Sequence, residues 1–115
     1  MHEAHISAAL IAAAEGEHVL VVAATADEKQ IIFKRLVEAF DGLQPGLLQS
    51  INRTNGGERI DLVTGGGIRF AHLNERRRRA AVYDQVFVPI GTAPEFLADL
   101  APALATSEVG LITGY

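Results

Sequence analysis

The run HVLVVAA, residues 18–24, constrains the fold more than any other stretch of the chain. It is continuously apolar, has the length of a strand and is rich in β-branched valine. A strand with one wet face would alternate polar and apolar residues, so this run is expected to be buried on both faces. Strands of that kind lie in the middle of parallel sheets, whose crossover connections are usually helical. An α/β fold is therefore the first expectation.

Helical segments flank this strand on both sides. Residues 3–15 consist largely of strong helix formers with an apolar stripe, and Gly16 is placed to end that helix in a left-handed turn. After the strand, the sequence TADE, beginning at Thr25, has the form of a capping box and opens a second helix that Gly42 should stop. Apolar residues at helical spacing in this second helix should cover one face of the sheet.

A hairpin is expected in the middle of the chain. Residues 43–57 are rich in turn formers and are interpreted as a loop with room for one irregular strand. RIDLV and IRFAHL, residues 59–63 and 68–73, each alternate polar and apolar positions. TGGG separates them, and its glycines can take the positive φ angles that a hairpin turn requires.

The last third of the chain repeats the pattern of strand and helix. DQVFVPI, residues 84–90, predicts a second buried strand, and APEFLADLAPALA predicts a helix that Pro102 should kink or end early. The closing EVGLITGY predicts a last short strand. A three-layer α/β domain with a mainly parallel sheet and one hairpin is therefore expected over residues 1–115.

The composition is that of one folded domain. Of the 115 residues, 49% are hydrophobic and 21% charged. The absence of cysteine excludes disulfides, thiolate zinc sites and cysteine nucleophiles. The four histidines are scattered; His2 and His5 are near neighbours, but a solvated chain end explains them, so no metal is expected. No apolar run has the length of a membrane span and MHEAHIS lacks the basic flank of a secretory signal, which makes a cytoplasmic location the expectation.

Several motifs follow one another in a familiar order. HVLVVAATADEKQIIFKRL joins a core strand to a helix, RIDLVTGGGIRFAHLN forms a hairpin, RRRRAAVYDQVFVPIG approaches a buried strand, and SEVGLITGY closes the chain. From about residue 3 to the end, this order resembles the ATPase core of phage large terminase subunits and superfamily 1 and 2 helicases, taken from just after the phosphate-binding loop. The resemblance implies a P-loop-NTPase-like sheet and a phage-encoded protein. A small Rossmann-like domain of another family is the alternative.

The chain departs from that family at the residues that perform its chemistry. No G-x-x-x-x-G-K-[ST] sequence is present, and Pro89 and Ile90 stand where the resemblance would place the Walker B acids. The resemblance therefore implies a retained scaffold without nucleotide hydrolysis, and no enzyme activity or cofactor is expected.

Arg76, Arg77, Arg78 and Arg79 form the sharpest local feature in a chain of net charge −4. Together with Arg53 and Arg69 they are candidates for binding nucleic acid or another anion through phosphate contacts. The alternative is that they pair with nearby acids such as Glu75 and Asp84, or with a partner subunit.

Other reactive side chains form no motif. TGGG is followed by neither a lysine nor a helix, which favours a plain turn over a phosphate loop. Asp61 and Asp84 give no reason to be placed together as a carboxylate pair. The serines lack a nucleophile-elbow context: Ser7, Ser50 and Ser107.

The first helix carries apolar residues on almost every side. Such a helix is either deeply buried or shared with another subunit. In a domain this small sharing is favoured, and the candidate interface residues are Ile6, Leu10 and Ile11. We therefore expect a homo-oligomer, with a dimer favoured.

Three functions remain open from the sequence. The first is a non-catalytic protein-binding or regulatory module acting on a host or phage protein. The second is nucleic-acid binding through the arginine-rich segment 76–79. The third is an enzyme acting on a small molecule at the carboxyl ends of the strands, near Ala24, Thr25, Gly91 and Thr92, where open α/β folds bind ligands.

Overall fold

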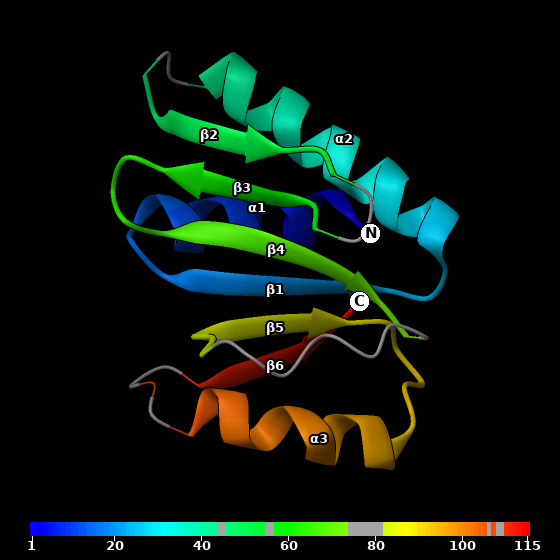
Figure 1. The fold of residues 1–115 in the computed structure, drawn as a ribbon. Helices are drawn as coiled ribbons and strands as arrows, with labels where there is room; N and C mark the ends of the chain where they lie inside the picture. Colours follow the sequence, from blue (N-terminus) through cyan, green and yellow to red (C-terminus); the bar gives the residue numbers. More distant parts are fainter. Residues whose placement is uncertain (44–45, 55–56, 74–81, 106, 108–109) are drawn as a thin grey trace.

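The chain forms one sheet with helices on both of its faces (Figure 1). The structure, a computed structural model, describes residues 1–115 except 44–45, 55–56, 74–81, 106 and 108–109. Among the described residues six strands pair in the order β2-β3-β4-β1-β5-β6. The α/β prediction with a mostly parallel sheet is thereby confirmed. The elements are α1 (Glu3–Ala14), β1 (His18–Ala23), α2 (Ala26–Leu43), β2 (Leu48–Asn52), β3 (Arg59–Leu62), β4 (Gly67–His72), β5 (Gln85–Val88), α3 (Pro94–Leu104) and β6 (Leu111–Gly114).

Strand β1 lies inside the sheet, as its continuous apolar run predicts. It pairs in parallel with β4 on one side and with β5 on the other, and Val19 to Ala23 are all buried. Alternate residues of β1 feed two separate cores. Val19 and Val21 pack with α1 and α2, whereas Leu20 and Val22 pack with α3. Burial on both faces is therefore the physical reason for the missing alternation.

The helices follow the sequence patterns except at their ends. The Thr25 hydroxyl accepts a hydrogen bond from the Glu28 amide at 3.1 Å, as in a capping box. Gly42 does not stop α2, which runs on to Leu43. After this helix, the first glycine with a positive φ is Gly46. Pro102 does not end α3 early; it lies in the last turn, and the helix reaches Leu104. A proline is tolerated there because only one intrahelical bond is lost.

The predicted hairpin pairs β3 with β4 in an antiparallel arrangement, and its turn packs against the end of α1. A Cβ atom on Gly66 would lie 2.2 Å from the Ala13 carbonyl oxygen, and one on Gly67 would lie 2.6 Å from the Ile60 carbonyl oxygen. The Thr64 hydroxyl donates to the same Ala13 oxygen at 3.2 Å. The glycines are thus needed for close backbone approach as well as for the positive φ of Gly65.

The irregular strand expected in residues 43–57 is β2, which pairs with β3 and has a register shift between Leu48 and Ser50. The buried residues on the α3 side come from α3, β1 and β5, with Ala71 of β4 and Tyr83. Figure 1 shows α1 and α2 grouped with β1 to β4, and α3 beside β5 and β6. No helix of the described residues covers the α3 side of β2 and β3, and among these residues that half of the sheet face is open.

In the part of the chain that the structure describes, no helix is both long enough and apolar enough to cross a bilayer.

Candidate anion-binding face of the sheet

The open half of the sheet carries a polar surface. Ile60 and Leu62 of β3 point into the core with α1 and α2, so Arg59 and Asp61 point to the opposite side. The same alternation in β4 buries Ile68 and directs its neighbours outward. The strand register then forms two cross-strand rows on the open face: Ser50, Asp61, Gly67 and His18 in one, and Asn52, Arg59, Arg69 and Leu20 in the other.

Two arginines stand side by side on this face. Arg59 and Arg69 are direct partners in the antiparallel pair of β3 and β4. Like charges directly opposite each other in a sheet are destabilising, so this placement needs a compensating negative charge. Asp61 supplies part of it, because its Oδ2 accepts from Arg59 Nε at 3.1 Å and from the Ser50 hydroxyl at 3.0 Å.

Arg69 has no such partner. Among the described residues no hydrogen bond or ion pair involves its guanidinium, and the side chain is exposed. A guanidinium presents five N–H donors in a rigid fork that suits carboxylate and phosphate groups. Arg69 is thus the cation of this face that is best placed to take an external anion.

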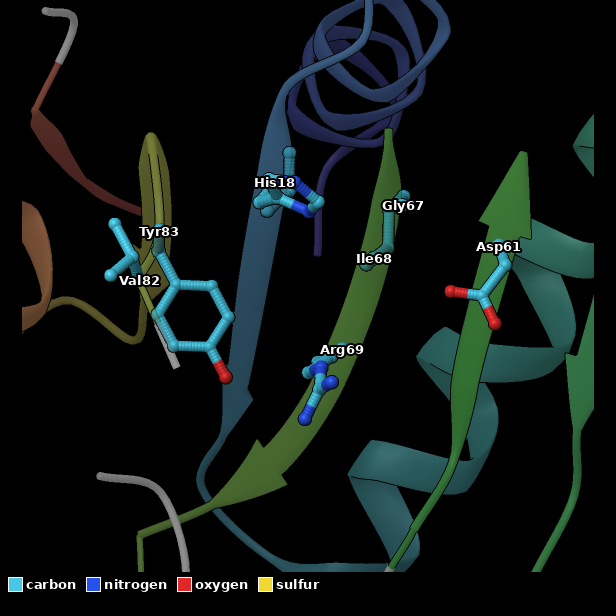
Figure 2. A pocket seen from close by; sticks show the side chains of 8 residues that line it. His18, Asp61, Gly67, Ile68, Arg69, Val82 and Tyr83 are labelled. Carbon is cyan, nitrogen blue, oxygen red and sulfur yellow. The ribbon is translucent and has the colours of Figure 1, made fainter. Parts of the chain in front are cut away.

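A depression of about 330 Å³ lies next to Arg69. Figure 2 shows Arg69 between Tyr83 on one side and Asp61 on the other. Backbone and side chains of three strands and of the segment before β5 form its lining: His18, Val19, Asp61, Gly67, Ile68, Arg69, Val82 and Tyr83.

Tyr83 brings a phenol ring to the lining of the depression. It is only 4% exposed. Burial raises the pKa of its hydroxyl, and the positive charge of Arg69 acts in the opposite direction. A phenol is protonated at neutral pH even at its ordinary pKa of about 10, so the hydroxyl of Tyr83 can donate a hydrogen bond.

Asp84 has a structural role at the border of this face. Its carboxylate accepts from the His18 amide at 2.7 Å and from the Ser107 hydroxyl at 2.6 Å. The Ser107 hydroxyl first, and the His18 amide next, lower the pKa of Asp84. Asp61 belongs to β3, and β4 and β1 stand between β3 and β5, so the two aspartates do not form a carboxylate pair.

The structure separates two of the candidate anion-binding arginines. Arg53 lies 5.9 Å from the centroid of the Phe33 ring, and Phe33 packs on Phe70 in the core with α1 and α2. Arg69 points to the other side of the sheet, so the two arginines lie on opposite faces. Arg53 instead lines a second depression with Lys34. Arg76 to Arg79 lie outside the described residues.

The candidate interface residues of α1 also separate. Ile6 and Leu10 are 4% and 9% exposed because they pack in this chain's own core, whereas Ile11 is 54% exposed. Only Ile11 among the three therefore offers surface to another molecule. The apolar character of α1 is explained by its burial against the sheet, with small residues on the outside.

The carboxyl edge of the sheet is occupied by the chain itself. The Tyr115 hydroxyl donates to the Val22 carbonyl oxygen at the end of β1, and the Tyr115 amide donates to the Val88 carbonyl oxygen at 2.9 Å. Burial raises the pKa of Tyr115, and the nearby Glu28 adds to the effect. Pro89 and Ile90 follow β5, as the sequence indicates, and no group of three or more potential metal ligands occurs in the described residues.

Sequence reasoning missed two members of the candidate site, Arg59 and Tyr83. The alternation in RIDLV already placed Arg59 on the polar face of its strand. What the sequence lacked was the pairing register, which sets Arg59 opposite Arg69. No local signal marked Tyr83, because its burial depends on α3 packing against it from a distant part of the chain.

Comparison with protein-family models, with curated proteins and with solved structures gives no match for this chain, so the candidate site is defined by its own geometry.

Proposed function

We propose that the chain is a non-catalytic module that binds nucleic acid by its phosphates on the open face of the sheet. The observation that carries the proposal is the cross-strand pair of Arg59 and Arg69, of which Arg69 has no anionic partner among the described residues. Phosphate contacts from arginine supply most of the affinity of sequence-independent nucleic-acid binding.

The rest of the open face fits backbone contacts better than base recognition. Asn52 and Ser50 continue the two rows toward the sheet edge, and both side chains can hydrogen-bond to phosphate oxygens. The described rows present no exposed aromatic ring on which a base could stack. The arginine run 76–79, which lies outside the described residues, is a further candidate for phosphate contacts.

We further propose that the sheet is a P-loop-NTPase-like core that has lost its chemistry, with a Rossmann-like domain as the alternative. Three features support the first version: β1 leads into α2, a hairpin follows, and β5 lies between β1 and β6. The strand β5, at the Walker B position of the resemblance, ends in Pro89 and Ile90, neither of which can hold a cation.

Binding of a single-stranded oligonucleotide of about 20 nucleotides at several salt concentrations tests the function. We expect measurable affinity at low salt that falls steeply as salt is added. Arg69→Gln should weaken binding to all sequences alike and reduce the salt slope by about one unit, as removal of one phosphate contact does. Lys34→Gln is the matched control, since it removes one exposed positive charge from the other side of the sheet.

Two results would contradict the proposal. If the chain fails to bind at low salt, it is not a nucleic-acid binder. If Lys34→Gln weakens binding and Arg69→Gln does not, the ligand lies over α2 and not on the open face. Replacement of Arg77 and Arg78 by Ala measures the share of the arginine run in the same assay.

A second candidate function is protein binding at the edge of β6, with another copy of this chain as the partner. In the described structure β6 is an edge strand without charge or proline, and Leu111 and Ile112 are exposed. Natural edge strands are usually protected against pairing. Sedimentation should show a mass that rises with concentration, and Ile112→Lys should abolish the rise. A constant monomer mass would exclude self-association.

A further inference from the structure

We propose that the depression beside Arg69 is a subsite for a terminal phosphate monoester, at the end of a nucleic-acid strand or on a free nucleotide. The inference rests on the proposed function, because it specifies which part of the ligand Arg69 holds. Hydrogen-bond donors and charge both support a monoester over an internal phosphodiester.

The depression is small. Its volume of about 330 Å³ lies at the low end of small-molecule sites. Val82 and Tyr83 bound it on one side and Asp61 on the other (Figure 2). A single phosphate group is of a size that fits it.

The donors around the depression match three terminal oxygens. Arg69 lines the depression and offers a complete guanidinium fork. Arg59 is not part of the lining, but its Nε binds Asp61, which is, and its terminal N–H groups remain as donors beside the depression. Tyr83 belongs to the lining and adds a hydroxyl, which is protonated at neutral pH and can donate. A monoester has three terminal oxygens to accept these bonds, whereas a diester has only two non-bridging oxygens.

The charge at the depression points the same way. The second pKa of a phosphate monoester is about 6, so that it carries close to two negative charges at neutral pH, and an internal diester carries one. The two cross-strand arginines contribute two positive charges, and Asp61 offsets one of them while it is bound by Arg59 and Ser50. A dianion therefore relieves the repulsion between Arg59 and Arg69 better than a monoanion does.

The experiment compares two oligonucleotides of the same sequence, one with a 5′-phosphate and one with a 5′-hydroxyl, together with adenosine monophosphate and adenosine. The purified full chain should bind the 5′-phosphorylated strand roughly tenfold more tightly, as expected for a charge-assisted hydrogen-bond pair. Adenosine monophosphate should bind and compete with that strand, and adenosine should do neither.

Variants separate the subsite from the surrounding surface. Arg69→Gln should remove the preference for the phosphorylated end, and Tyr83→Phe should reduce it severalfold while the buried ring is kept. Lys34→Gln, on the other side of the sheet, should leave the preference unchanged. Thermal unfolding of each variant establishes that it is folded before its binding is compared.

The two proposals fail in different ways. Equal affinity for the two strands, lost together in Arg69→Gln, would overturn the monoester subsite and keep nucleic-acid binding. Binding of adenosine monophosphate without binding of either strand would overturn nucleic-acid binding and support the subsite alone. An end preference that survives Arg69→Gln would overturn the assignment of the subsite to this depression.

Discussion

At the residue scale, Asp84 shows how one side chain joins three strands. Its carboxylate binds the His18 amide and the Ser107 hydroxyl, and its carbonyl oxygen accepts from the Leu111 amide at 3.0 Å. It therefore fixes the beginnings of β1, β5 and β6 relative to one another. Its three partners, His18, Ser107 and Leu111, lie far from Asp84 in the sequence, and only the folded chain brings them to it.

This network makes a pH-dependent contribution to stability. The hydrogen bonds lower the pKa of Asp84 from its ordinary value of 3.8, so the folded state favours the carboxylate. The contribution is fully present above pH 3.8 and is lost as the pH falls through the lowered pKa. We expect Asp84→Asn to reduce the free energy of unfolding by about 1 kcal/mol at neutral pH.

Urea unfolding at a series of pH values measures this effect. The difference between the original chain and Asp84→Asn should shrink below pH 3.8. Asp41→Asn, which changes an exposed carboxylate at the end of α2, serves as the control and should alter stability by less than about 0.5 kcal/mol. A difference that stays constant down to strongly acidic pH would show that the carboxylate charge has no part in it.

Single residues were the least predictable level from the sequence. From the sequence, Asp84 and Asp61 were correctly not expected to form a carboxylate pair. The hydrogen-bond partners of Asp84 could not be identified. Its bond to His18 spans 66 positions and its bond to Ser107 spans 23. Hydrogen bonds of this kind have no local pattern, because they depend on the order of strands in the sheet.

At the element scale, the helix α2 and its buried apolar stripe were predicted from the sequence, but the buried ion pair of this helix was not. Its apolar stripe is buried as the helical spacing indicates: Ile32, Phe33, Leu36, Val37 and Phe40. Lys29 lies on the same stripe, three positions before Ile32, and its Nζ is 3.1 Å from Glu58 Oε2. The side chains of Lys29 and Glu58 are 2% and 0% exposed. The Gln30 amide also donates to Glu58 Oε2 at 2.5 Å.

Removal of one charge from this buried pair should be costly. In Lys29→Met the buried carboxylate of Glu58 would lose the ammonium group of Lys29, and we expect a loss of about 3–5 kcal/mol of stability. Lys34→Met removes an exposed lysine from the same helix and should change stability by less than about 0.5 kcal/mol. Chemical unfolding of the two variants tests the prediction. Equal, small effects would mean that the pair contributes little.

The sequence contained a signal that Lys29 is buried, since its position continues the helical spacing of the apolar stripe. A lysine at such a position is more often solvated, and the acidic partner that makes its burial possible precedes a strand on the far side of a loop. Strands gave a clearer signal. β1 and β5 were both read as buried from apolar runs alone, whereas β6 reads as apolar and lies at an exposed edge.

At the scale of the whole molecule, the sequence predicts the kind of fold but not its asymmetry. Alternating helices and apolar strands indicate an α/β sheet, which the structure confirms. Which helix covers which face depends on the direction of each crossover, and no residue encodes that by itself. The open half of the sheet, and with it the candidate site, follows from α3 packing beside β5 and β6 instead of across the hairpin.

This asymmetry predicts unequal local stability. The core with α1 and α2 contains large side chains from both helices and from four strands, among them Phe40, Phe87 and Leu36. The core on the other side depends on three residues of α3, namely Phe96, Leu100 and Leu104. Segments with fewer buried apolar contacts open at lower free energy. Amide hydrogen exchange should therefore be faster in α3 and β6 than in β1 and β4.

Leu100→Ala sharpens the test, because Leu100 is buried at the centre of the smaller core. Loss of a buried leucine side chain costs about 2–5 kcal/mol, and we expect faster exchange in α3 and in the neighbouring β6. Amides of α1 and α2 should respond less, since their core lies on the other face of the sheet. If all amides accelerate equally, the two cores unfold as one cooperative unit, and the open face is then held as rigidly as the rest of the sheet.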